Sequence, residues 1–106
     1  MFPPRPSEKQ ILAEVRRLVV LGSVRWQKSH CLPQLADRDI SQDEVIACLL
    51  NGWFFERPYV ENRAGDTQYR MTIQATVDGR RLRTPIALRP ERNVLILSSI
   101  DLDQER

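Results

Sequence analysis

The residues best suited to chemistry lie in one stretch of the sequence, between Lys28 and Gly52. It holds the only histidine, His30, and an arginine eight residues later, Arg38. An imidazole can act as an acid or a base near neutral pH, and a guanidinium can bind a phosphate through two parallel hydrogen bonds. This pair therefore suits chemistry on a phosphodiester, with His30 moving a proton and Arg38 holding the phosphate.

A short helix is expected to position these two side chains. Pro33 fits the first turn of a helix that begins near Ser29 or His30, because a missing N–H does no harm there. Positions 30, 34 and 38 of such a helix share one face. The spacing therefore predicts that His30, Gln34 and Arg38 point the same way, as a binding surface or as an ordinary solvated stripe.

Two capping boxes mark further helix starts. Residues 7 and 10 form a Ser-x-x-Gln box before an apolar stripe of helical spacing, and Gly22 is expected to end that helix. Residues 41 and 44 form a Ser-x-x-Glu box before a second apolar run, which residues 51 and 52 are expected to end. These signals predict that the first half of the chain is mainly helical.

Strand patterns fill the second half. Trp53 begins an aromatic, strand-like run, and the polar residues 61–66 are expected to form a loop. Residues 67–77 and 80–88 alternate in polarity on either side of Asp78-Gly79, a strong hairpin signal, and residues 93–100 are apolar almost throughout. Pro85 lacks a ladder donor, which indicates an edge strand or a bulge. Residues 23–28 suit a short strand or an extended connector.

Helices followed by strands predict an α+β domain, with N-terminal helices packed on one face of a three- to four-stranded antiparallel sheet. The length of 106 residues fits a single domain. Residues 1–6, with three prolines, are expected to form an extended lead-in, and residues 101–106 an acidic tail that frays.

The predicted hairpin carries further candidates for binding a substrate. Arg70, Arg81 and Arg83 fall on its polar face, where they would either contact a nucleic-acid backbone or simply face solvent. Alternation assigns Tyr69 to the core side, although a bulge would turn the phenol outward toward a phosphate or a base. Lys28 precedes the histidine closely enough to share its cleft, unless it is only an exposed charge.

Composition narrows the class of protein. The net charge is +2, and the 16 basic residues include only two lysines, a bias that suits phosphate recognition or reflects GC-rich coding. Cys31 and Cys48 are expected to be buried, reduced thiols, because their spacing fits neither a zinc site nor a disulfide framework. No cofactor motif is present. No apolar run is long enough to span a membrane, so a cytoplasmic protein is expected.

The spacing from His30 onward resembles a bacterial family described as a domain of unknown function, DUF4258, over about residues 12–100. The matching positions are His30, Arg38, Ile40, Ser41, Glu44, Val45, Leu49 and Gly52. Gln34 departs from the pattern, because the family usually has an arginine there. The family is similar to RelE-like and barnase-like RNase toxins, so the resemblance implies a small domain that cleaves or binds RNA and is often paired with an antitoxin.

Three functions follow as hypotheses. The first is a toxin-like, metal-independent endoribonuclease, with His30 as acid or base and with Arg38 and a sheet arginine on the phosphate of an RNA such as ribosome-associated mRNA. The second is a non-catalytic RNA- or protein-binding module, which Gln34 favours. The third is a protein-binding domain that uses the strand beginning at Trp53 as an edge for pairing.

Overall fold

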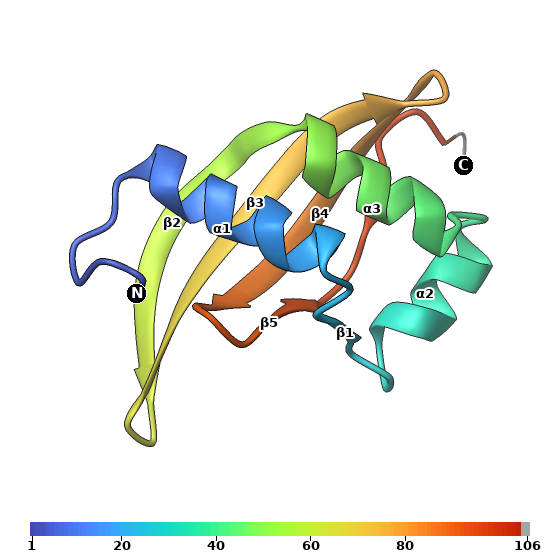
Figure 1. Ribbon diagram of the computed structural model, residues 1–106. Helices are drawn as coiled ribbons and strands as arrows, with labels where there is room; N and C mark the ends of the chain where they lie inside the picture. The colour runs from blue at the N-terminus through green and yellow to red at the C-terminus, as the bar shows by residue number, and fades with distance from the viewer. Residues whose placement is uncertain (105–106) are drawn as a thin grey trace.

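The structure is a computed structural model that describes residues 1–104, except for the side chain of residue 63. The elements within this range are α1 (Glu8–Val20), β1 (Val24–Trp26), α2 (Cys31–Asp37), α3 (Gln42–Asn51), β2 (Trp53–Arg63), β3 (Asp66–Val77), β4 (Arg80–Arg89), β5 (Asn93–Ile96) and β6 (Ile100–Asp101). Helices precede most of the strands, so the predicted α+β class is confirmed (Figure 1).

The sheet differs from the prediction in size and direction. It has six strands within the described residues, in the order β1-β5-β4-β3-β2, with β6 beside β4. β1 runs parallel to β5, and the other pairs are antiparallel. The expectation of a three- to four-stranded antiparallel sheet was therefore wrong, because β1 pairs with residues some seventy positions away, as in Val24 with Val94.

Local capping signals fix the helix starts. Ser7 Oγ accepts a hydrogen bond from the Gln10 N–H at 3.1 Å, and Gln10 Oε1 accepts one from the Ser7 N–H at 2.8 Å. The same reciprocal pair joins Ser41 and Glu44 at 3.0 and 2.9 Å. Both predicted capping boxes are thus confirmed, and each satisfies backbone donors that have no partner inside the helix.

The core lies between one face of the sheet and the helices α1 and α3, which lie on the same side in Figure 1. Alternate residues of β3 and β4 point into this core, as the period of a strand requires. The largest fully buried side chains come from both layers: Leu18, Val15, Val45, Leu49, Ile73, Leu82, Ile86, Leu88, Val94 and Ile96.

The opposite side of the sheet, which we call the open face, has neither α1 nor α3 over it. It is formed by the alternate residues of the long strands that do not enter the core. From β2 to β5 these include Phe55, Glu56, Tyr59, Gln68, Arg70, Thr72, Gln74, Arg81, Arg83, Pro85, Ala87, Arg89 and Leu95.

Two hairpins connect the long strands. Asp78 and Gly79 have φ values of 50° and 78°, which confirms the predicted turn. The expected loop at residues 61–66 was wrong, because β2 continues to residue 63 and turns at Ala64 and Gly65, with φ values of 50° and 83°. The hairpin tip carries polar residues on both faces, so the alternation that marks a half-buried strand is absent there.

Pro85 lies inside β4, which has neighbours on both sides. Its carbonyl accepts a hydrogen bond from the Leu97 N–H at 3.0 Å. Because the N and C=O groups of one residue in an antiparallel strand point to the same side, the proline nitrogen, which carries no hydrogen, also faces the β5 side of β4. Regular pairing on that side is interrupted at residues 97–99 before β6 begins. The sequence predicted an edge strand or a bulge at Pro85. The interruption in pairing instead lies in residues 97–99, and β4 is not an edge strand.

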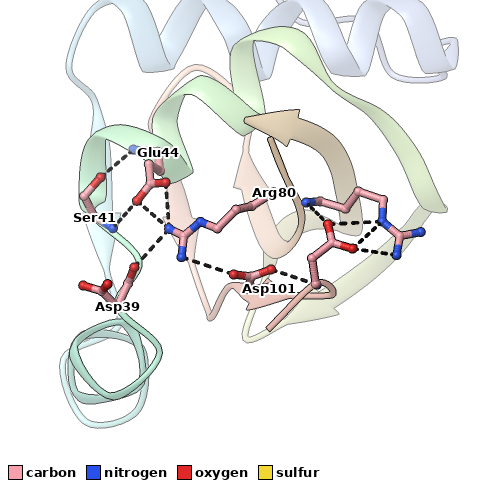
Figure 2. Close-up of polar contacts among 7 residues, drawn as sticks. Asp39, Ser41, Glu44, Arg80 and Asp101 are labelled. Atoms are coloured by element: carbon pink, nitrogen blue, oxygen red, sulfur yellow. Dashed lines mark hydrogen bonds and ion pairs between the residues drawn. The ribbon is translucent and has the colours of Figure 1, made fainter. Parts of the chain in front are cut away.

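The C-terminal segment is fastened to the fold rather than frayed. Asp101 is 9% exposed, and it lies 3.1 Å from Arg80, which also contacts the Glu44 carboxylate at 2.7 Å and the Asp39 carbonyl at 3.0 Å (Figure 2). We call these four residues the Arg80 cluster. The expected frayed tail was wrong for residues 101–103, and residues 105–106 of that tail lie outside the described residues.

Candidate nucleic-acid interface

The polar stripe predicted on α2 divides into an exposed and a bonded part. His30 is exposed at the start of α2, and its side chain makes no capping hydrogen bond. Gln34 Oε1 accepts from the Ser98 hydroxyl at 2.6 Å, and Arg38 Nη1 donates to Ser98 Oγ at 3.2 Å and to the Ser99 carbonyl at 2.7 Å. Gln34 and Arg38 therefore share a face as predicted, and they fasten α2 to the segment after β5.

This contact explains why glutamine suits position 34. The Ser98 hydroxyl donates to Gln34, and an arginine there would have no acceptor to offer. It would also place a second guanidinium beside Arg38. Glutamine at position 34 thus has a structural reason, and Arg38 uses its Nη1 group on the protein itself.

The three predicted sheet arginines have different surroundings. Arg81 Nη2 and Nε donate to Asp103 Oδ1 at 2.8 and 3.1 Å, and Nε also donates to Oδ2 at 3.3 Å. This ion pair holds the pKa of the Asp103 carboxyl below its usual value. Arg83 Nε donates to Gln74 Oε1 at 2.8 Å, and its guanidinium lies 3.5 Å from the centre of the Phe55 ring. Arg70, the third of these arginines, forms an ion pair but has one N–H group without a hydrogen-bond acceptor.

The Arg70 side chain is 27% exposed, and its Nε lies 3.6 Å from Glu61 Oε1. That Nε atom is buried, and no atom of the described residues accepts a hydrogen bond from it. A buried donor left unsatisfied costs about 1–3 kcal/mol, so this atom favours a ligand that supplies an acceptor.

Two hollows lie on the open face, and Arg70 and Leu97 line both. The smaller has a volume of about 180 Å³ and is lined also by Glu56, Tyr59, Met71, Thr72, Pro85 and Ile86. The larger measures about 470 Å³ and is lined also by Gln27, Ala64, Asp66, Gln68, Ala87, Arg89 and Leu95. The pair thus combines an apolar floor with arginines and amide side chains, which suits a ligand with rings and phosphates.

The turn before α2 connects the predicted histidine to this surface. Gln27 lines the larger hollow, and its carbonyl accepts a hydrogen bond from the Cys31 N–H at 2.9 Å. This bond forms a single turn that contains Lys28 and His30. Both of these side chains are exposed. His30 therefore lies on the turn that joins the wall of the larger hollow to α2.

Tyr69 and the two cysteines are removed from this surface. Tyr69 is 6% exposed and packs edge-on against Phe2 in the core, so its phenol is not turned toward a ligand on the open face. Cys31 and Cys48 are buried, unpaired thiols as predicted, and burial raises the pKa of both. Such thiols stay protonated at neutral pH and are poor nucleophiles.

Of the residues that line the two hollows, only Arg70 was a predicted site residue, and Arg89 and Tyr59 illustrate why others were missed. Arg89 continues the alternation of Arg81 and Arg83, so it would have been found if the predicted strand had not ended at residue 88. Tyr59 follows register shifts between Phe54 and Tyr59 in β2, which change the phase of the alternation. No simple period could have placed it on the open face.

Metal and membrane signals are absent from the part of the chain described here. Residues 1–104 contain no cluster of three or more His, Cys, Asp or Glu side chains able to hold a metal ion. Nor does any helix in this range have the length and apolar character needed to cross a bilayer.

Fold and surface together define the class: an α+β domain with an arginine-lined open sheet face and a polar helix fastened at the sheet's edge. Residues 28–97 match the family described as a domain of unknown function, DUF4258. The chain belongs to this family, and the match is shorter than the resemblance over residues 12–100 suggested. Comparisons with curated proteins and with solved structures find no match.

Proposed function

We propose that this protein is an RNA-binding domain that holds single-stranded RNA on its open face. The observation that carries the proposal is the unsatisfied Arg70 Nε between two hollows with apolar floors. Single-stranded RNA offers phosphate oxygens to such a donor and unstacked bases to the hollows. The choice of RNA over other polyanions rests on the resemblance to the RNase toxins.

The surroundings of the predicted residues favour binding through the sheet. Arg38 and Gln34 are bonded to residues 98 and 99, and Arg81 is bonded to Asp103, so these side chains are less available to a phosphate. Arg70 lines both hollows and Arg89 the larger one, and they supply positive charge beside the carboxylates of Glu56 and Asp66. Tyr59, 57% exposed, offers a ring on which a base can stack.

Binding of a labelled single-stranded RNA of about twelve nucleotides, measured by fluorescence anisotropy, tests the proposal. Arg70→Gln removes a charged hydrogen-bond donor worth about 1.5–3 kcal/mol, so Kd should rise by about 10- to 100-fold. The slope of log K against log salt should also fall by about 0.7.

Arg57→Gln is the matched control, because Arg57 is an arginine of the neighbouring strand with a side chain 83% exposed and lies outside both hollows. It should change Kd by less than about threefold, as expected for a peripheral charge. Equal losses in the two variants, or no RNA binding by the folded wild type, would refute the proposal.

Catalysis is a second candidate function, and the exposed, unbonded His30 on the turn beside the larger hollow favours it. In this mechanism His30 accepts the proton of a ribose 2′-hydroxyl, whose oxygen attacks the adjacent phosphorus. The P–O5′ bond breaks, Arg70 stabilises the phosphorane charge, and water protonates the leaving oxygen.

The catalytic candidate predicts that His30→Ala folds normally, retains RNA binding and loses RNA cleavage. Gel analysis of labelled RNA after incubation with each protein measures this, with Ser29→Ala as a control from the same exposed turn. Wild-type cleavage by His30→Ala would rule out the histidine as acid or base. An antitoxin partner stays a prediction of the resemblance, and the exposed Trp53 and Phe55 of edge strand β2 are the surface to test for it.

A further inference from the structure

The smaller hollow has a size and a wall that suit one kind of occupant. Its volume of about 180 Å³ is below the roughly 300–1,000 Å³ of sites that hold whole drug-sized ligands, and it suits a single planar ring. Pro85 and Leu97 supply apolar contacts, and Tyr59 supplies an aromatic ring. Met71 and Ile86 also line the hollow, but they are 3% and 0% exposed and belong to the core on the other side of the sheet. A base of a bound RNA strand has the matching shape and flat apolar faces.

The polar part of the wall consists of a carboxylate held in place. Thr72 is 5% exposed, and its hydroxyl donates to Glu56 Oε1 at 2.6 Å. The Thr72–Glu56 bond orients the carboxylate on the wall of the hollow. No described residue donates a hydrogen bond to the other oxygen, Glu56 Oε2, so it can accept one from a ligand.

A carboxylate accepts hydrogen bonds and cannot donate them, so it distinguishes among bases. Cytosine and adenine carry an exocyclic amino group that can donate to Glu56. Uracil has a carbonyl oxygen at the ring position where cytosine carries its amino group, and this oxygen would face the negative carboxylate. Cytosine and uracil have nearly the same shape, so the exchange of an amino group for a carbonyl decides between them.

We propose that the smaller hollow is a base pocket that accepts a base with an exocyclic amino group and discriminates against uracil through Glu56. This inference rests on the proposed function, because the base enters as part of an RNA strand held by Arg70. Arg70 lines both hollows, so a phosphate bound there would lie beside a base in the smaller one.

The test uses RNA oligonucleotides of about eleven residues, all uridine except for a central position that is uridine, cytidine or adenosine. Wild type should bind the cytidine and adenosine forms about tenfold more tightly than the all-uridine form. Glu56→Gln should reduce this preference to about twofold or less, because an amide can donate to uracil as well as accept from an amino group.

The ratio of affinities is the readout, because loss of a negative charge strengthens binding of all three RNAs alike. Glu8→Gln is the charge-matched control on α1, and it should keep the wild-type ratio. Thr72→Val is a second variant that keeps the carboxylate but removes the hydroxyl that orients it, and it should also lower the ratio.

The outcomes separate the two proposals. If wild type binds all three RNAs equally and Arg70→Gln still weakens binding, the base pocket is refuted and the proposed function stands. If folded Glu56→Gln keeps the full preference, Glu56 is not its cause and the inference fails. If wild type binds none of the RNAs, both proposals fall.

Discussion

At the scale of single residues, Gly52 ends α3 as the sequence predicted, but glycine is required there for a different reason. A glycine after a helix usually serves a left-handed cap, and the sequence predicted a helix stop here on that ground. Gly52 has φ −91° and ψ −177°, an extended conformation open to any residue. A Cβ atom would instead lie 2.4 Å from the Gln74 carbonyl oxygen and 2.7 Å from Ile73 Cγ2, so close approach to β3 requires glycine.

Gly52→Ala is therefore expected to destabilise the fold by about 2 kcal/mol or more, as overpacking against backbone does. Urea denaturation followed by circular dichroism measures the change in free energy of unfolding. Gly65→Ala is the control, because nothing lies within 4 Å of its Cβ position and its φ of 83° costs only backbone strain, roughly 1–2 kcal/mol. If Gly52→Ala lowered the free energy of unfolding by less than Gly65→Ala, the backbone around Gly52 would have to move away from β3 at little cost, contrary to this prediction.

At the scale of elements, local signals were sufficient wherever an element depends on its own neighbours in sequence. The capping boxes and the Asp78-Gly79 turn involve residues at most three positions apart, and the structure confirms them. The helix α2 was also predicted, since Pro33 and the apolar positions lie within two turns. The side chains of Gln34 and Arg38 were correctly assigned to one face.

Non-local pairing accounts for what the sequence could not show. The parallel pairing of β1 with β5 depends on residues far apart in the chain, and no period in either segment encodes it. The hydrogen bonds of Arg38 with residues 98 and 99 likewise depend on segments far apart in the chain. Arg38, which the sequence predicted to bind a phosphate, therefore connects α2 to the segment after β5. The hollows lie between strands and include Tyr59 only because β2 shifts register.

At the scale of the whole molecule, the Arg80 cluster joins parts of the chain that no single element connects. Arg80 begins β4, Glu44 lies in the first turn of α3, Asp39 precedes that helix, and Asp101 belongs to β6 (Figure 2). The Arg80 and Asp101 side chains are 26% and 3% exposed, so the pair is shielded from solvent. An uncompensated charge here would be costly, so both partners must be present.

The cluster makes stability depend on pH. The Ser41 N–H, followed by the guanidinium of Arg80, holds the pKa of Glu44 below its ordinary value of 4.5. Since the folded pKa is lower than the unfolded one, the carboxylate contributes its full stabilisation above about pH 4.5 and loses it as pH falls through the folded value. The pKa of Glu14 is lowered in the same way, first by its hydrogen bond to Arg17.

Glu44→Gln separates this contribution from that of the other carboxylates. The amide keeps the shape of a protonated glutamic acid, so the variant should be less stable than wild type by about 2 kcal/mol at neutral pH, the size of a charged hydrogen bond. The difference should shrink toward zero as the pH falls below 4.5 and through the lowered pKa of folded Glu44, where the wild-type carboxylate takes up a proton. Urea denaturation of both proteins across this range measures it, with Asp37→Asn, at an exposed position on α2, as the control. A difference that stays constant with pH would mean that the carboxylate charge does not stabilise the joined elements, and that Glu44 acts only through its shape.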